Sequence, residues 1–162
     1  MDGWSLRPAA AADADALARL RWAFRAELGQ AAEDEASFLE RAAAWIAARL
    51  DEGRRWQAWL VEDDRGEAIG CGWLQLIEKV PNPGLEEELH GYVTSMYVAP
   101  AWRNRGIGAA LLRAALDACR AAQVDSVILW PTSGSRDLYA RRGFAAPGDV
   151  LEVRIGSGRA LP

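Results

Sequence analysis

The sequence is poor in the residues from which metal sites and disulfide frameworks are built. Its 162 residues include two cysteines, Cys71 and Cys119, and one histidine, His90. No Cys-x-x-Cys pair occurs, so the spacing indicates neither a zinc site nor a redox dithiol. We expect no metal and two buried free thiols, because unpaired cysteines are among the most buried residue types.

Long apolar runs and an excess of basic residues are also missing. No segment approaches the roughly 20 apolar residues that cross a bilayer, and the first residues lack the pattern of a signal peptide. We therefore expect a cytoplasmic protein without a membrane partner. The formal net charge of −4 argues against a nucleic-acid-binding protein, which usually carries a basic face. Lys79 is the single lysine among 19 basic residues, which is typical of coding bias.

Length and composition are those of one globular domain over residues 1–162. Hydrophobic residues make up 51% of the chain and charged residues 26%, as in soluble domains with a core. Hydrophobic periodicity predicts a meander of antiparallel strands combined with a β-α-β crossover. Strands are expected at 5–8, 56–62, 68–77, 89–98, 126–130 and 150–155. Helices are expected between Asp13 or Asp15, as N-cap, and Gly29, and at 33–50, 107–122 and 134–142.

The strongest local pattern lies between the strand that ends at Val98 and the helix that begins near Ile107. The intervening loop carries Arg103-x-x-Gly106-x-Gly108. A glycine-bearing turn aims several backbone N–H groups at one point, and the helix start adds free donors and a partial positive charge. This combination is typical of a phosphate site. The alternative is a tight loop that merely starts a helix.

A second block follows about 30 residues later, Leu138-Tyr139-x-x-x-Gly143-Phe144. With Met96-Tyr97-Val98-x-Pro100-x-x-Arg103-x-x-Gly106-x-Gly108 before it, the chain resembles the GCN5-related N-acetyltransferase (GNAT) superfamily. The resemblance implies an α+β fold of three layers, with a mixed, mostly antiparallel central sheet flanked by helices. It also implies acetyl-CoA as co-substrate.

The resemblance implies roles for residues that match the family's blocks. The strand ending at Val98 should splay from its neighbour and leave backbone groups free for the pantetheine arm. Tyr139 should protonate the leaving thiolate as general acid, although it is alternatively a packed aromatic. Thr132 and Ser135 stand where many relatives have Asn and Ala, and both are polar enough to contact the cofactor. The backbone groups expected to bind acetyl-CoA are those of Met96, Tyr97, Val98, Arg103, Asn104, Arg105, Gly106, Ile107, Gly108 and Ala109.

The expected reaction is direct attack of an amine on acetyl-CoA, so neither cysteine needs to act as a nucleophile. Glu27, near the end of the first helix, and His90, at the start of a strand, are candidates for substrate contact. His90 is also a candidate for the base that takes a proton from the amine. Each has a structural alternative, Glu27 as an exposed acid on a helix and His90 as a structural polar residue. The run Glu86-Glu87-Glu88 is either a solvated loop or a field that attracts a cationic amine.

The sequence therefore predicts an enzyme that acetylates a small-molecule or peptide amine, with a slight preference for cationic metabolites. The competing interpretation is a non-catalytic acyl-CoA sensor or interaction module. Members of the superfamily often form dimers, which makes a homodimer a further expectation. Of the eight tryptophans, Trp45 and Trp59 fit core-facing patterns.

Overall fold

A computed structural model describes residues 3–53, 55–84 and 88–153 of the chain. Contacts divide the chain into two compact units, Met1–Leu129 and Trp130–Pro162. Within the described ranges, no helix is both long and apolar enough to cross a membrane.

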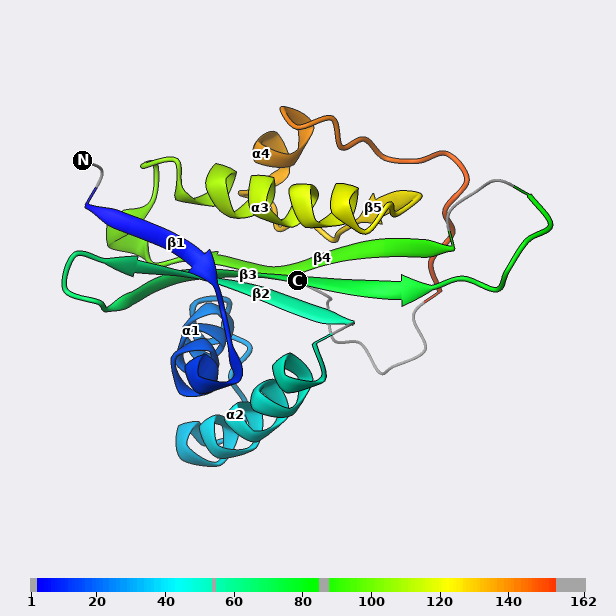
Figure 1. Ribbon diagram of the computed structural model, residues 1–162. Helices are drawn as coiled ribbons and strands as arrows, with labels where there is room; N and C mark the ends of the chain where they lie inside the picture. Colours follow the sequence, from blue (N-terminus) through cyan, green and yellow to red (C-terminus); the bar gives the residue numbers. More distant parts are fainter. Residues whose placement is uncertain (1–2, 54, 85–87, 154–162) are drawn as a thin grey trace. The chain divides into compact units, whose positions relative to one another are not determined.

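The first unit is a five-stranded sheet with helices on both faces (Figure 1). The strands lie in the order of the chain, with the first four antiparallel and the last one parallel to its neighbour. Helices α1 and α2 cover one face and α3 covers the other. This arrangement confirms the mixed, mostly antiparallel sheet of an α+β fold. The elements are β1 (Trp4–Pro8), α1 (Ala14–Glu27), α2 (Glu35–Glu52), β2 (Trp56–Asp63), β3 (Ala68–Glu78), β4 (Leu89–Val98), α3 (Ile107–Ala121) and β5 (Ser126–Ile128).

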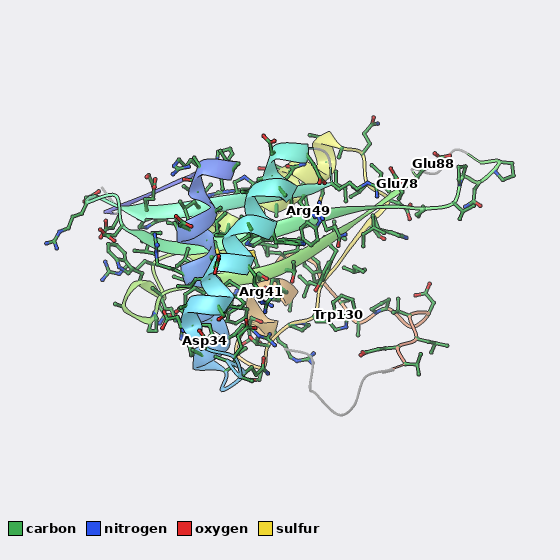
Figure 2. All side chains as sticks on the ribbon, turned by 90° about the horizontal axis from the view of Figure 1, so that it is seen from below. Asp34, Arg41, Arg49, Glu78, Glu88 and Trp130 are labelled. Atoms are coloured by element: carbon green, nitrogen blue, oxygen red, sulfur yellow. The ribbon has the colours of Figure 1, made fainter. Side chains whose placement is uncertain are left out.

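Helix α2 begins and ends at residues that local chemistry selects. The Asp34 side chain accepts a hydrogen bond from a first-turn backbone N–H at 2.9 Å and caps the helix. Gly53 ends it in the left-handed conformation, with φ of 67°. Figure 2 shows Asp34 at the start of this helix and Arg41 and Arg49 further along it.

The predicted cap of α1 is different in the structure. Asp13 occupies the N-cap position but makes no side-chain cap hydrogen bond. Its carboxylate instead accepts two hydrogen bonds from Arg7 at 2.8 Å and one from the Ala10 N–H at 2.8 Å. Arg7 also pairs with Glu62 at 2.9 Å. The Asp13 carboxylate therefore connects β1 to the start of α1 instead of capping the helix.

Each face of the sheet packs on its own core. Leu17 and Leu20 of α1 and Ile46 of α2 are buried against β2, β3 and β4. Trp59 is buried as predicted. The prediction that Trp45 faces the core is wrong, because 44% of its surface is exposed. Its ring packs edge-on against Trp56 at 5.2 Å, so the apolar stripe of α2 extends past the buried core.

Close packing of α3 against the sheet depends on glycines in the strands. A Cβ atom added at Gly91 of β4 would lie 2.8 Å from the Cys119 sulfur of α3. One at Gly72 of β3 would lie 3.5 Å from a methyl carbon of Leu111 of α3 and 2.5 Å from the Met96 sulfur of β4. Cys119 and Leu111 are fully buried on the inner side of α3. The absence of side chains at these strand positions lets the helix approach the sheet.

The second unit contains the short helix α4 (Arg136–Ala140), which falls within the predicted 134–142. The predicted last strand, 150–155, is not found over residues 150–153, and residues 154 and 155 lie outside the described ranges. Val150, Leu151 and Val153 are exposed, Leu151 to 95%. An alternating apolar pattern makes a strand only where a neighbour supplies hydrogen bonds and cover.

Candidate functional site

The edge of β4 opens near its C-terminal end. Strand β5 pairs with β4 only from His90 to Tyr92, so residues 93–98 have no strand partner on that side within the described chain. On the other side, the Ala99 N–H donates to the Ile69 carbonyl of β3 at 2.8 Å. Because antiparallel pairing alternates, the backbone groups of Val98 turn toward the open edge. The free backbone groups that the resemblance implies at the end of this strand therefore have an open edge to face, and the splay itself stays a prediction.

A β-bulge lies next to the open edge. Cys71 of β3 pairs with Tyr97 and Trp73 pairs with Thr94, so Gly72 faces two residues of β4. One of them, Ser95, has a φ of 51°, which is unusual for a residue other than glycine. A bulge of this kind bends the strand and re-aims its side chains and backbone groups.

The loop before α3 leaves the first-turn amides of that helix available. Gly106 is the N-cap residue, with φ of 80°, and no side chain caps the helix. Asn104 is also left-handed, with φ of 64°. The N–H groups of Ile107, Gly108 and Ala109 have no intrahelical acceptor, because the first turn of any α-helix lacks one. Such a terminus attracts an anion through its donors and its dipole.

The Arg103 side chain is partly exposed and makes hydrogen bonds within the protein. Its Nε donates to the Val98 carbonyl at 3.0 Å and its Nη2 to the Glu27 carboxylate at 2.7 Å. The guanidinium also lies 5.9 Å from the centre of the Tyr97 ring. The hydrogen bond from Arg103 lowers the pKa of Glu27 below its usual range. Glu27 therefore lies at the candidate site, where it pairs with Arg103 of the loop. Its lowered pKa makes the carboxylate a weak base.

Some of the residues predicted to bind acetyl-CoA make contacts within the protein. The Arg103 N–H donates to the Pro100 carbonyl at 3.3 Å, so this amide takes part in the preceding turn. The Arg105 guanidinium lies 4.7 Å from the centre of the Trp102 ring. The Met96 sulfur fills the space beside Gly72. The N–H of Val98 and the amides at the start of α3 therefore remain the best-presented donors.

The second unit brings Tyr139, Thr132 and Ser135 together. The Thr132 hydroxyl donates to the Ser135 hydroxyl at 3.0 Å, which in turn donates to the Thr132 carbonyl at 3.1 Å. Tyr139 is buried and packs edge-on against Phe144 at 5.8 Å. Burial raises the pKa of the Tyr139 phenol, while the Ser135 hydroxyl acts in the opposite direction. The phenol consequently stays protonated at neutral pH.

His90, and Glu88 just before β4, lie far from the open edge. The His90 Nδ1 is 2.7 Å from the Ser126 hydroxyl, at the paired end of β4 and β5. Five residues separate it from Ser95, or about 16 Å of extended strand. Glu86 and Glu87 lie outside the described residues, and Figure 2 shows Glu88 close to Glu78. The structure does not bring His90 or Glu88 to the bulge.

The cysteines have the environment of packing residues. Both Cys71 and Cys119 are free and buried, as predicted. Burial raises the pKa of Cys71 to about 12 and that of Cys119 to about 11. Such thiols are poor nucleophiles at neutral pH because the thiolate is the reactive form. Among the described residues, no group of three or more His, Cys, Asp or Glu side chains is placed to hold a metal ion.

Sequence reasoning missed one charged residue near the bulge, Arg21. Its Nη1 donates to the Ser95 hydroxyl at 3.0 Å, and its guanidinium lies 5.7 Å from the centre of the Phe24 ring. A signal was available, because Arg21 interrupts the apolar positions Leu17, Leu20 and Phe24 at helical spacing. A charged residue within a core-facing stripe points to a partner on the opposing element.

Comparison with known proteins places the chain in a family. The family model described as Acetyltransferase (GNAT) family matches residues 15–144. A curated relative, the mycothiol acetyltransferase of Beutenbergia cavernae, is 36% identical over 104 residues, which make up 59% of this chain and 32% of that longer protein. The match therefore spans well under half of the relative's length.

Two solved structures share the fold. A GCN5-related N-acetyltransferase from Ralstonia eutropha JMP134 has a TM-score of 0.78 at 28% identity, covering 95% of this chain and 100% of that one. A predicted acetyltransferase from Clostridium acetobutylicum, solved with acetyl-CoA, has a TM-score of 0.77 at 20% identity, covering 94% and 96%. Because the family model matches most of the sequence, the chain belongs to the acetyltransferase (GNAT) family.

Proposed function

We propose that this protein is an N-acetyltransferase that moves the acetyl group of acetyl-CoA to a primary amine. The observation that carries the proposal is the open edge of β4, which leads directly into the uncapped start of α3. An extended chain can add to a free strand edge through backbone hydrogen bonds, and a phosphate fits a helix N-terminus. Acetyl-CoA has both features in this order, a pantetheine arm followed by a pyrophosphate.

The residues present fit such a ligand at both ends. Gly106 adopts a φ of 80° without a side chain that would occupy the space in front of the helix. Ile107, Gly108 and Ala109 supply first-turn amides, and the N–H of Val98 faces the edge of the strand. Acetyl-CoA supplies an activated acetyl group as a thioester. The protein's part is to bind the arm, orient the thioester and manage protons.

Tyr139 is the proposed general acid. In the reaction, a bond forms between the nitrogen of the neutral amine and the acetyl carbon as the carbon–sulfur bond breaks. The nitrogen gives up one proton to water, and the leaving thiolate takes up one proton from the Tyr139 phenol, which water then reprotonates. A phenol suits this task because its reference pKa of about 10 is close to that of a thiol. Burial, which raises the pKa of Tyr139, keeps the proton available. The similarity to a mycothiol acetyltransferase supports acetyl transfer as the class of reaction.

The proposal is tested by thermal melting followed by a turnover assay. Saturating acetyl-CoA should raise the melting temperature, since a ligand that binds only the folded state stabilises it, by roughly 2.7 kcal/mol at 100 times its Kd. Analogues without the 3′-phosphate or without the pantetheine arm should give smaller shifts. Release of free thiol is then measured with a panel of primary amines. No shift with acetyl-CoA overturns the assigned binding site.

A non-catalytic acyl-CoA sensor is the alternative that the same site allows. The two functions differ in the Tyr139→Phe variant. In an enzyme, the variant loses turnover and keeps its affinity for acetyl-CoA. In a sensor, the wild type and the variant bind acetyl-CoA equally well, and neither releases thiol with any amine. A clear melting shift without thiol release across the panel would decide for the sensor.

A further inference from the structure

Arg21 places a positive charge inside the first unit, between α1 and the bulge of β4. The residue is half-buried. One terminal nitrogen donates to the Ser95 hydroxyl at 3.0 Å, and the guanidinium lies 5.7 Å from the centre of the Phe24 ring. A guanidinium has five N–H donors in a planar fork. The hydroxyl of Ser95 satisfies only a small part of this capacity.

The surroundings of Arg21 contain no compensating carboxylate among the described residues. The pKa of Arg21 is lowered chiefly by burial, and the positive charge of Arg25 lowers it further. The other neighbours that influence it are the Cys71 thiol and the Tyr92 phenol. Arg103, by contrast, has Glu27 at 2.7 Å, and Arg7 has both Asp13 and Glu62.

A partly buried cation without an anionic partner costs folding free energy. Charges removed from water are normally paired and hydrogen-bonded. A hydrophobic residue at this position of α1 would fit the core-facing stripe without that cost. An arginine held in this environment therefore indicates that its partner is supplied by a ligand.

The position of Arg21 identifies that ligand as the acetyl acceptor. Ser95, which it contacts, belongs to the bulge, and Met96 to Val98 follow it directly along the edge proposed to bind the pantetheine arm. A strand advances about 3.3 Å per residue. The guanidinium of Arg21 therefore lies a few ångströms along β4 from the edge at which an amine would meet the thioester.

We propose that Arg21 binds a carboxylate of the acceptor, so that the substrate is an amino acid whose carboxylate lies close to its amine. The assignment rests on the proposed acetyltransferase function. A guanidinium pairs with a carboxylate through two parallel hydrogen bonds, which fixes orientation as well as charge. The positive charges of Arg21 and Arg25 disfavour a polycationic amine at the same place, in contrast to the acceptor that the acidic run 86–88 suggested.

The test is calorimetric binding of matched ligands to the CoA-bound protein. The probes are the common L-amino acids, their α-carboxamides, and the pair of O-phosphoethanolamine and ethanolamine. Arg21→Gln removes the charge, Arg21→Lys keeps the charge without the fork, and Arg19→Gln is the control on the exposed side of the same helix. Melting temperatures establish that each variant is folded. Thiol release from acetyl-CoA is followed with the same amines.

We expect the wild-type protein to bind at least one amino acid at least tenfold more tightly than its carboxamide. Arg21→Gln should weaken binding of the acid about 10- to 100-fold and that of the carboxamide by less than about twofold, in line with hydrogen bonds to charged groups. Arg21→Lys should be intermediate, and Arg19→Gln should resemble wild type. The same losses should appear in KM if the acid is turned over.

Several results would overturn the assignment. Equal binding of acids and carboxamides, or binding of neither, excludes carboxylate recognition, and a preference for O-phosphoethanolamine replaces it with a phosphate. An equal loss for both ligands in Arg21→Gln indicates that the residue only supports the bulge. If acids bind through Arg21 and no thiol is released, the carboxylate site stands and the proposed function is overturned. If only carboxamides are turned over, the proposed function stands and the carboxylate site is overturned.

Discussion

The Glu27 carboxylate accepts a hydrogen bond from Nη2 of Arg103 at 2.7 Å and so joins the C-terminal end of α1 to the loop before α3. The same arginine holds the Val98 carbonyl at the end of β4. The C-terminal end of α1 thus meets the end of β4 and the loop that follows it at one guanidinium, although α1 is far from both in the sequence. All three border the region proposed to receive the pyrophosphate, which gives the ion pair a role in shaping the loop.

We predict that Glu27→Gln destabilises the protein slightly and in a pH-dependent way. The two side chains are 38% and 42% exposed, so the loss at pH 7 should be about 0.2–1 kcal/mol. Because the pKa of Glu27 is lowered in the folded state, its stabilisation is complete above the usual carboxyl range and is lost as pH falls through the lowered pKa. Urea unfolding from pH 7 to pH 3 measures this.

The matched control for this prediction is Glu40→Gln, an exposed acid on α2. It should leave the free energy of unfolding within about 0.5 kcal/mol of wild type. The difference between wild type and Glu27→Gln should shrink toward pH 3. A difference that stays constant across the pH range would show that the carboxylate charge makes no contribution.

The relationship between Glu27 and Arg103 could not be read from the sequence, although much of its setting could. The predicted strand 89–98 agrees with β4 at both ends because Pro and Gly residues precede it and Pro100 follows it. The start of α3 was predicted because Gly106 and Gly108 mark a turn and a helix terminus. These features depend on residues that are neighbours in the chain, which is the range over which pattern reasoning works.

The features that were missed depend on residues from different elements. The bulge at Ser95 and Met96 contains no glycine of its own, and it becomes visible only in the register opposite Gly72. Arg21 of α1 is informative only because its guanidinium donates to Ser95 of β4. Trp45 has core-facing spacing, yet 44% of its surface stays exposed although its ring lies 5.2 Å from Trp56 and 6.4 Å from Trp73. The hydrophobic periodicity of one helix or strand does not specify how far that element lies from another.

We predict that Ala109→Asp has opposite effects on stability and on cofactor binding. A carboxylate in the first turn of α3 interacts favourably with the helix dipole and should stabilise the free protein by about 0.3–1 kcal/mol. The same charge repels a bound pyrophosphate and should weaken acetyl-CoA binding about tenfold or more at low salt. Thermal melting without ligand and calorimetric titration with acetyl-CoA measure the two effects.

Ala109→Asn is the neutral control for the aspartate variant. It has almost the same size and should change the acetyl-CoA affinity much less. Raising the salt concentration should reduce the affinity difference between the two variants, because salt screens charge interactions near the surface. If both variants bind acetyl-CoA equally well at low salt, the pyrophosphate does not lie at this helix terminus.

We predict that Tyr139→Phe lowers kcat by about 100-fold or more while the Kd of acetyl-CoA changes little, which is the range of general acid catalysis. The variant keeps the ring that packs against Phe144 at 5.8 Å, so the melting temperature should stay close to wild type. Because burial raises the pKa of the Tyr139 phenol, the acid stays protonated through neutral pH. The alkaline fall in the wild-type kcat should lie above the usual tyrosine range of about 10.

The pH profile separates this role from a structural one. The alkaline limb of kcat that depends on the phenol should be absent in Tyr139→Phe. A variant with a wild-type profile and a small loss of kcat would exclude Tyr139 as the proton donor. An equal loss of acetyl-CoA affinity and turnover would assign the hydroxyl to binding instead.

We predict that Gly91→Ala destabilises the protein through the contact between β4 and α3. A Cβ atom at this position would lie 2.8 Å from the Cys119 sulfur and 3.4 Å from side-chain atoms of Leu74 and Val127. Because Cys119 and Leu74 are fully buried, the neighbours have little room to move. The loss in free energy of unfolding should be about 1–3 kcal/mol.

A double-mutant cycle identifies the sulfur as the cause of this loss. Cys119→Ala removes the atom that the new methyl group would meet, so the double variant should be less destabilised than the sum of the single variants by about 0.5–3 kcal/mol. Gly84→Ala is the control, because its Cβ would have nothing within 4 Å. Strict additivity of Gly91→Ala and Cys119→Ala in urea unfolding would mean that α3 does not press on the strand at this point, and that glycine is required there for another reason.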